Sequence, residues 1–282
     1  MKNIVVGIDF SENSLSSLRH ATAIALKTGG ALHLVWVKTA SIMKGVEALK
    51  KDSLINLAHE ELEKLVNESK AEAPNSHIQS VILEGKPYLE LTRYAANLKE
   101  SMIVIGTHGI SGFEERIIGS NAFKTVGAST VPVLVLREGI KIKRDIIQVL
   151  VPIDTSFETL QKVKPAVVLA KLFAAKIILT GFVLENNAEE RHVVSVQVKH
   201  AAKLCARANI RYEDSIVNYK GNMAKAVVKY GSQHEVNLMV IMREGEVDIA
   251  DIWLGSTTQQ LLNTSPMPVL VIPNVNHYLV TK

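Results

Sequence analysis

The sequence predicts an α/β protein of two tandem domains, each built on a doubly wound, parallel, five-stranded sheet. Short apolar runs alternate with longer segments of helical periodicity, the order that helical crossovers between parallel strands produce. The same series of signals occurs twice within 282 residues. Hydrophobic residues make up 47% of the chain and charged residues 21%, which excludes a disordered protein and is enough for two cores.

Two pairs of matching segments define the repeat. Ile4–Ser11 (IVVGIDFS) corresponds to Val149–Ser156 (VLVPIDTS) at an offset of 145 residues. Val131–Leu136 corresponds to Met267–Ile272 at an offset of 136. The difference between the offsets predicts a deletion in the second copy, in the connection after its second strand. We therefore expect domains at 1–140 and 141–282, joined by a short charged linker over 137–144.

The first copy begins with a strand and a helix. Ile4–Ile8 is a β-rich run of the kind found in buried parallel sheets. Ser11 is a suitable N-cap for the helix that follows, and Gly29-Gly30 is expected to end it before a second strand at 31–37. The apolar face of this helix is expected to contain four residues: Leu15, Leu18, Ala25 and Leu26.

A long helix is expected over residues 46–72. The residues spaced for burial on it are Leu54, Leu57, Leu62, Leu65 and Val66. Glu60, Glu61 and Glu63 are interpreted as a solvated face. The remaining elements are a strand over 77–83, a helix starting at Gly85-Lys86-Pro87, a strand over 102–105, a short helix over 120–128 and a last strand over 131–136.

A glycine-punctuated loop follows the fourth strand. It reads Gly106-Thr107-His108-Gly109, then nine residues, then Gly119-Ser120 at the start of the short helix. Glycine lets the backbone approach an anion closely, and the first N–H groups of a helix point toward it. The loop is therefore predicted to cradle phosphate, although simple turn formation by the glycines is an alternative.

The spacing G-x2-G-x9-G-[ST] resembles the nucleotide loop of the universal stress protein family. The resemblance extends to Asp9 at the end of the first strand, to Gly85 and Pro87 after the third, and to the closing Val131-Pro132-Val133 segment. It covers both halves of the chain and is therefore to the tandem form of the family.

This resemblance implies an adenine-nucleotide ligand: ATP, or ADP or AMP, with Mg²⁺ as an accompanying ion. Gly106, Gly109, Gly119 and Ser120 would hold the phosphates. Asp9 would accept hydrogen bonds from ribose or adenine, and the backbone near Val37 would meet the adenine edge. For Asp9, a local cap before the first helix is the alternative.

The resemblance also implies that the last strands of the two copies, 131–136 and 267–272, pair as an internal pseudo-dimer. The sequence leaves open whether two whole chains assemble further into a homodimer.

The second copy departs from the nucleotide pattern. Met242 stands at the position of Gly106, whereas Gly245 and Gly255-Ser256 are retained. Four acids follow Met242: Glu244, Glu246, Asp248 and Asp251. Two unit charges ~5 Å apart repel by about 3 kcal/mol at an effective dielectric near 20, more than the ~2 kcal/mol that a helix terminus offers. Unless Mg²⁺ bridges the charges, the second site is expected to bind nucleotide weakly or not at all.

Other candidate residues are weaker. His108 is interpreted as a polar loop residue rather than a phosphate ligand or acid. His192, His200 and Cys205 share one predicted helix but lack the spacing of a zinc site. Trp36 and Trp253 are interpreted as core or loop anchors. We expect neither a resident metal site nor a catalytic residue.

Charge and composition exclude other classes of protein. Residues 1–140 carry 15 basic and 15 acidic side chains, and residues 141–282 carry 17 and 13, without the basic clusters of nucleic-acid binders. No apolar run approaches the ~20 residues of a membrane helix, and no signal peptide is evident. The single cysteine fits a reducing compartment. A cytoplasmic protein that binds neither nucleic acid nor membrane is expected.

Three functions fit the sequence. The chain lacks both G-x4-G-K-[ST] and a G-x-G-x-x-G after its first strand. We therefore favour a nucleotide-binding regulatory module of the stress response over an enzyme. The alternatives are a slow ATPase or adenylate-releasing enzyme that uses the same pocket, and a scaffold that binds no nucleotide.

Overall fold

The computed structural model describes residues 2–40, 48–107, 118–137, 146–244 and 254–274. The chain forms two compact units, one N-terminal and one C-terminal. The predicted boundary between residues 140 and 141, and most of the predicted linker at 137–144, lie outside the described residues.

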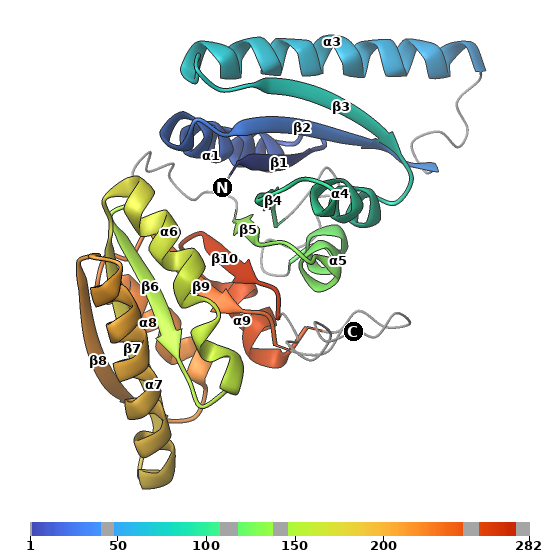
Figure 1. The fold of residues 1–282 in the computed structure, drawn as a ribbon. Coiled ribbons are helices and arrows are strands. Elements are labelled where there is room, and N and C mark those ends of the chain that lie inside the picture. The colour runs from blue at the N-terminus through green and yellow to red at the C-terminus, as the bar shows by residue number, and fades with distance from the viewer. Residues whose placement is uncertain (1, 41–47, 108–117, 138–145, 245–253, 275–282) are drawn as a thin grey trace, which may run out of the picture. The chain divides into compact units, whose positions relative to one another are not determined.

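The N-terminal unit is a parallel sheet with the strand order β3-β2-β1-β4-β5 (Figure 1). Its elements are β1 (Asn3–Ile8), α1 (Glu12–Thr28), β2 (Ala31–Lys38), α3 (Ala48–Glu72), β3 (Ile78–Glu84), α4 (Pro87–Ala96), β4 (Ser101–Gly106), α5 (Ser120–Ala128) and β5 (Val133–Leu136). Helices α1 and α3 contact each other, as do α4 and α5. The strand order reverses between β1 and β4, so this is the doubly wound fold predicted from the alternation of strands and helices.

Local signals fix the helix ends of this unit. The Ser11 side chain accepts a hydrogen bond from the Ser14 N–H at the start of α1. Gly29 ends α1 with φ +63°, a conformation that glycine adopts without a Cβ penalty. Pro87 occupies the first turn of α4, where its missing N–H costs nothing. These three predicted boundaries are confirmed.

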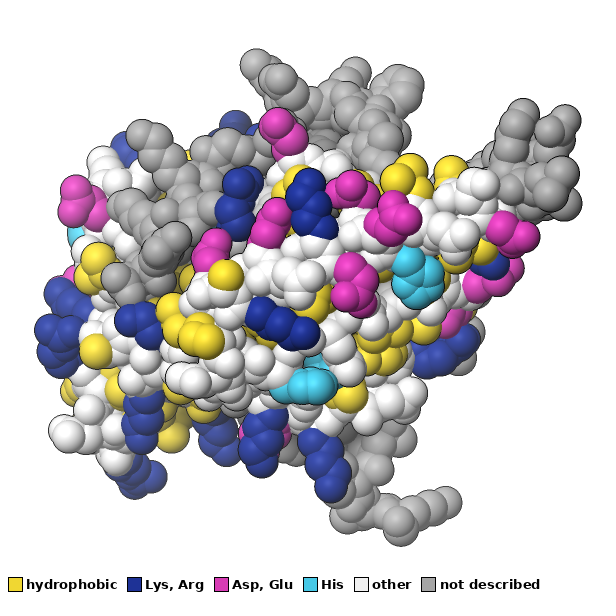
Figure 2. Space-filling model, turned by 90° about the horizontal axis from the view of Figure 1, so that it is seen from above, with side chains coloured by type: hydrophobic (Ala, Val, Ile, Leu, Met, Phe, Trp, Pro, Cys, Tyr) yellow, Lys and Arg dark blue, Asp and Glu magenta, His cyan; other side chains and the backbone are white. Residues whose placement is uncertain are grey.

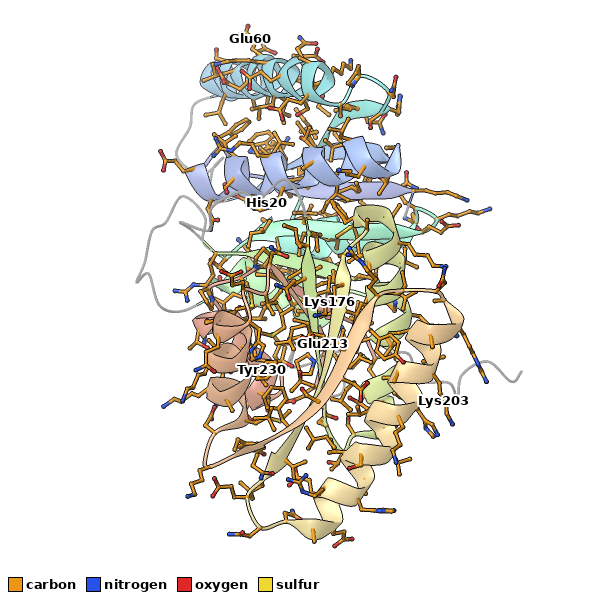
Figure 3. All side chains as sticks on the ribbon, turned by 90° about the vertical axis from the view of Figure 1, so that its left-hand side faces the viewer. His20, Glu60, Lys176, Lys203, Glu213 and Tyr230 are labelled. Atoms are coloured by element: carbon orange, nitrogen blue, oxygen red, sulfur yellow. The ribbon has the colours of Figure 1, made fainter. Side chains whose placement is uncertain are left out.

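Burial on the helices agrees with the prediction only in part. Leu18, Ala25, Leu62 and Val66 are buried, but Leu26 and Leu57 are 52% and 57% exposed, so their predicted burial was wrong. Among the described residues, no element packs over these faces of α1 and α3 closely enough to bury a leucine. Glu60, Glu61 and Glu63 are exposed on α3, as predicted. Figure 2 shows acidic side chains at the surface on this side, and Glu60 points away from the sheet in Figure 3.

The C-terminal unit repeats the architecture with the parallel order β10-β9-β6-β7-β8. Its elements are β6 (Gln148–Ile153), the 3-10 helix η1 (Phe157–Leu160), α6 (Val163–Phe173), β7 (Lys176–Leu184), α7 (Ala188–Arg207), β8 (Tyr212–Tyr219), α8 (Met223–Gln233), β9 (Leu238–Met242), α9 (Ser256–Thr264) and β10 (Val269–Ile272). Only 27 residues separate β7 from β8, whereas 39 separate β2 from β3. The predicted deletion after the second strand is therefore confirmed.

The pairing of the two last strands into a pseudo-dimer concerns how the units sit against each other. It stays a prediction.

Candidate nucleotide site

The register of the N-terminal sheet brings three predicted site residues to one edge. Ile8 pairs with Trp36, so Asp9 and Val37 follow at the same level at the carboxyl ends of β1 and β2. On the other side, Val6 pairs with Val104, so the register carries Ile8 to the level of Gly106, where β4 ends. Ligands of doubly wound sheets bind at this edge, where the strand order reverses.

The Asp9 carboxylate is held by the start of α1. Its Oδ1 accepts hydrogen bonds from the Ser11 N–H at 3.0 Å and the Ser11 hydroxyl at 2.6 Å. Within the described residues, no hydrogen bond reaches Oδ2. The local cap that the sequence offered as an alternative is therefore present, and it leaves one carboxylate oxygen for a ligand.

Gly106 is required by a contact that the sequence did not predict. A Cβ on Gly106 would lie 2.6–2.8 Å from three side-chain atoms of Asn13. Asn13 lies in the first turn of α1 and is 4% exposed. The sequence suggested that Gly106 leaves space for a closely approaching ligand. On this side of Gly106, the Asn13 side chain occupies that space.

A comparison of the two copies could have pointed to Asn13. The second copy has Glu158 at the position of Asn13 and Met242 at the position of Gly106, so both members of the contact change together. Without knowing that α1 packs over the end of β4, however, the two differences look unrelated.

Gly119 and Ser120 lie at the start of α5. The Gly119 N–H donates to the Thr107 carbonyl at 2.7 Å, and the Thr107 N–H donates to the Leu136 carbonyl at 2.9 Å. These bonds fix the beginning of α5 against the ends of β4 and β5. Ser120 is the exposed first residue of the helix, whose first N–H groups have no partners within the helix.

The N-cap Gly119 has φ −63° and ψ 151°, which any residue can adopt. Its value as a glycine therefore lies in the absence of a side chain at the helix terminus rather than in backbone freedom. Gly109 and His108 lie outside the described residues, and their predicted roles stay predictions.

An aromatic pair flanks the site and was not predicted. Phe10, with φ +64°, directly follows Asp9, and its ring centroid lies 6.3 Å from that of Trp36. Trp36 is 5% exposed, which agrees with its interpretation as a core anchor. The matching residues of the second copy are Thr155 and Gly181, so the aromatic pair belongs to the N-terminal unit alone.

In the C-terminal unit, a carboxylate of the chain itself occupies the helix start that corresponds to the start of α5. Glu244 follows β9, and its Oε2 accepts a hydrogen bond from the Thr257 N–H, in the first turn of α9, at 3.3 Å. Its backbone carbonyl accepts from the Gly255 N–H at 3.1 Å. A Cβ on Gly255 would overlap the Glu244 side chain. The negative group that this helix terminus attracts is thus part of the chain itself.

A buried ammonium group lies beside this carboxylate. Lys162 is 2% exposed, and its Nζ is 3.7 Å from Oδ2 of Asp154, the counterpart of Asp9. Burial lowers the pKa of Lys162, although the charges of Asp154 and Glu244 act in the opposite direction. Ser17 occupies the matching position of the N-terminal unit, so the buried cation is specific to the second copy.

Asp154 remains ionised beside this lysine. Burial alone would raise the pKa of Asp154, but the Lys162 charge and hydrogen bonds from Ser156 and Thr159 outweigh it and hold the pKa below its usual value. Its Oδ1 accepts hydrogen bonds from the Ser156 N–H and hydroxyl. Asp154 and Lys162 therefore form an ion pair at the C-terminal edge.

The remaining candidates do not come together. His192 and His200 are exposed on α7, whereas Cys205 on the same helix is buried. Across the described segments, no three His, Cys, Asp or Glu side chains form a group that could hold a metal ion. Trp253 lies outside the described residues. The described helices include none that is both long and apolar enough to cross a membrane.

The fold and the site together define a tandem doubly wound α/β protein in which, among the described residues, a carboxylate occupies the start of α9 and none occupies the start of α5. The family model for the universal stress protein family matches residues 1–137 and again 147–273. The chain belongs to the universal stress protein family.

Individual relatives agree with this assignment. Universal stress protein MJ0531 of Methanocaldococcus jannaschii is 32% identical over 140 residues, which are 49% of this chain and 82% of that protein. Universal stress protein Slr1230 of Synechocystis is 23% identical and covers 96% of this chain, with 99% of its own length matched. The crystal structure of a universal stress protein from Archaeoglobus fulgidus has a TM-score of 0.79 at 19% identity, covering 96% of this chain and 98% of its own. The tandem arrangement is thus shared along the full length.

Proposed function

We propose that the chain is a stress-response regulatory protein that binds an adenine nucleotide, ATP or else ADP or AMP, at one site in the N-terminal unit. The observation that carries the proposal is the contrast between the two helix termini. The N-terminus of α5 begins with an exposed Ser120, whereas the N-terminus of α9 holds the Glu244 carboxylate. The N-terminal site is proposed to control partners through the occupancy of its loop.

The residues at the N-terminal edge fit the parts of a nucleotide. The α5 terminus with Gly119 and Ser120 offers N–H groups and a hydroxyl to phosphate oxygens, with Gly106 and Gly109 completing the cradle. Asp9 has one carboxylate oxygen that can accept from ribose or adenine. The backbone of Val37, at the end of β2, would meet the adenine edge. Mg²⁺ would enter with the phosphates.

The same proposal covers the organisation of the chain. Residues 1–140 form the nucleotide-binding domain and residues 141–282 the degenerate one, joined as an internal pseudo-dimer. We place the protein in the cytoplasm. The repeat, the family and the matching order of five parallel strands in each unit support this domain organisation.

Charge placed at equivalent helix starts tests the proposal. Ser120 and Ser256 are both exposed first residues of nine-residue helices, α5 and α9. A glutamate at a helix start suits the helix dipole. At α9 it joins the Glu244 carboxylate, so circular dichroism must first show that both variants are folded. Ser120→Glu would set a carboxylate ~5 Å from a bound phosphate and cost about 3 kcal/mol, about a hundredfold in Kd. Ser256→Glu is the matched control and should leave Kd unchanged.

Isothermal titration calorimetry with Mg-ATP is the measurement. One ATP per chain, lost in Ser120→Glu and retained in Ser256→Glu, supports the proposal. Two equivalent sites, equal loss in both variants, or no binding to the wild-type chain would overturn it. Incubation with labelled ATP, with Ser120→Glu as background, reveals any ADP or AMP made by the alternative hydrolytic activity.

A further inference from the structure

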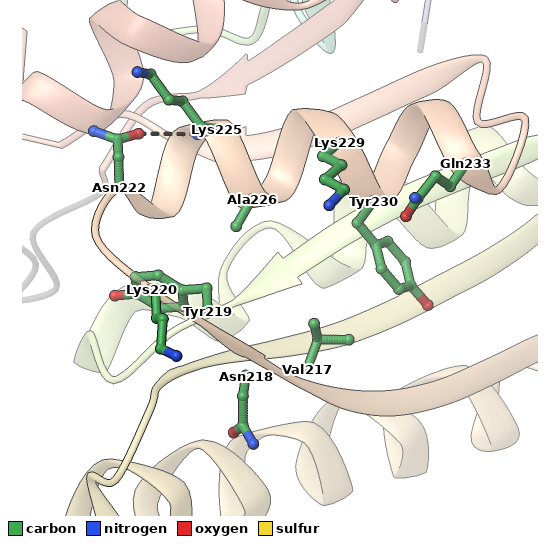
Figure 4. A pocket seen from close by; sticks show the side chains of 10 residues that line it. All are labelled: Val217, Asn218, Tyr219, Lys220, Asn222, Lys225, Ala226, Lys229, Tyr230 and Gln233. Carbon is green, nitrogen blue, oxygen red and sulfur yellow. Dashed lines mark hydrogen bonds between the residues drawn. The ribbon is translucent and has the colours of Figure 1, made fainter.

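A pocket lies beside the carboxyl end of β8, at the last position in the strand order of the C-terminal unit. Helix α8 packs through Ala224, Val227 and Gly231, which are buried, and its neighbouring face overhangs the edge strand β8. A pocket of ≈ 380 Å³ lies beneath this overhang, between α8 and the residues 217–220 (Figure 4). Its volume is within the range of small-molecule sites.

Three lysines line this pocket, and no acidic side chain does. Lys225 and Lys229 are one turn apart on α8, and Lys220 ends the opposite wall after β8. Lys220 forms an ion pair with Glu185 at 2.9 Å. Within the part of the chain that the structure describes, Lys225 and Lys229 form no ion pair. The pocket therefore carries an excess of positive charge.

The N-terminal unit neutralises the same positions. There, Arg93 is paired with Glu90 at 3.1 Å, and Glu84 with Lys38 at 2.7 Å. The second copy has Lys229 in place of Arg93 and Ala226 in place of Glu90. The small side chain at residue 226 opens space under the helix and leaves the lysine three residues later without its carboxylate.

Counted back from the start of the helix, Lys220 stands where the N-terminal unit has Glu84; each side chain is ion-paired, Glu84 with Lys38 and Lys220 with Glu185. Leu89 is replaced by Lys225. Lys225 adds a positive charge and Ala226 removes a negative one together with most of a side chain, so these two differences make the pocket more positive and larger.

The walls of the pocket are held by hydrogen bonds. Asn222 accepts from the Lys225 N–H at 2.9 Å and donates to Gln260 of α9 at 2.6 Å. The Tyr230 hydroxyl is hydrogen-bonded to Ser215 of β8 at 3.1 Å, and its ring stacks on His234. A ligand would therefore meet a pre-ordered frame and would have to order only the lysine side chains.

We propose that this pocket, which we call the α8 pocket, binds a small organic anion with at least two phosphate or carboxylate groups. One group would lie between Lys225 and Lys229, and another would reach Lys220, with the Asn222 and Gln233 side chains as neutral hydrogen-bonding partners. The ligand would occupy the C-terminal unit independently of the nucleotide in the N-terminal unit.

Calorimetry on the Ser120→Glu chain tests this proposal, because the N-terminal site is then blocked. Pyrophosphate and citrate are the probes, and they distinguish a phosphate from a carboxylate ligand. The test variant is Lys225→Gln with Lys229→Gln. The matched control is Lys199→Gln with Lys203→Gln, two exposed lysines with the same spacing on α7 (Lys203 is labelled in Figure 3).

Removing two charged hydrogen-bond donors should weaken binding about tenfold or more, whereas the control should change it less than about twofold. Ala226→Glu, which restores the carboxylate of the N-terminal copy, should weaken binding similarly, and Ala226→Gln should weaken it less. No heat with either probe, or equal weakening in test and control variants, would overturn the proposal.

Acetylation of lysines, read by mass spectrometry, gives an independent readout. The better probe should protect Lys225 and Lys229 but not Lys199 and Lys203, and equal protection of all four would count against the site. Failure here leaves the nucleotide proposal intact, because ATP binding is scored separately by its loss in Ser120→Glu.

Discussion

Replacing Asp154 by asparagine would leave the buried Lys162 ammonium group without the carboxylate that pairs with it. Lys162 Nζ lies 3.7 Å from the Asp154 carboxylate, and the lysine side chain is 3% exposed. Asparagine has the same shape and can still accept hydrogen bonds from Ser156, so the change removes little besides the charge. The expected loss of stability is about 3–5 kcal/mol at pH 7, the usual cost of breaking a buried ion pair from one side.

Proton release limits this cost. A lysine in the unfolded chain has a pKa near 10.4, so neutralising the amine at pH 7 costs at most about 5 kcal/mol, and at pH 9 at most about 2 kcal/mol. Burial already lowers the pKa of Lys162, and removal of Asp154 lowers it further. The unfolded variant then holds a proton that the folded variant releases. Its stability relative to wild type should therefore rise with pH, by about 1.4 kcal/mol per unit in this range.

Urea denaturation followed by circular dichroism at pH 7 and pH 9 measures both effects. Asp9→Asn is the matched control, because the residue at the position of Lys162 is the uncharged Ser17. That variant should lose only capping interactions, about 0.5–2 kcal/mol, equally at both pH values. A cost below about 1 kcal/mol for Asp154→Asn at pH 7, or one that persists unchanged at pH 9, would refute the reasoning.

Three further predictions concern single side chains. Cys205 is buried and its pKa is raised to about 11, so a disulfide reagent at pH 7.5 should label it only when urea unfolds the chain; rapid labelling of the folded protein would contradict this. Burial, assisted by Arg19, lowers the pKa of His20 to about 4, so the folded chain should lose up to about 3 kcal/mol as the pH falls from 6.5 to 4. His20→Gln should remove that slope in denaturation curves, and an unchanged slope would exclude His20 as its source. Gly181→Ala would place a Cβ 2.5 Å from Val194 and should lower the free energy of unfolding in urea by about 1–3 kcal/mol. Adding Val194→Ala should recover part of this loss. An unchanged free energy of unfolding in Gly181→Ala would count against this close contact between strand and helix.

Much of the fold is a local property of the sequence. The apolar runs, the Ser11 cap, Gly29, and the start of α5 at Ser120 act over a few residues, so their positions follow directly from the sequence. The repeat then gives the second unit the same order of elements. Parallel strands with helical crossovers leave few topologies, which is why the doubly wound sheet was predictable without contacts.

Side-chain roles at the site depended on tertiary structure. The sequence places Asp9, Val37 and Gly106 at strand ends, but only the register brings them to one level. Gly106 faces Asn13, which is 93 residues earlier in the chain, and no local pattern links the two.

The sequence by itself determined that there are two copies of one α/β domain and that the second copy has Met242 in place of Gly106, followed by four acids. Only the tertiary structure decided what the first of those acids does: Glu244 occupies the start of α9. It also showed that Lys162, which is 82 residues before Glu244 in the chain, lies buried beside Asp154. The physical reason is that burial and charge pairing depend on which distant elements fold together, whereas strands, helices and caps are specified within a few residues of each other.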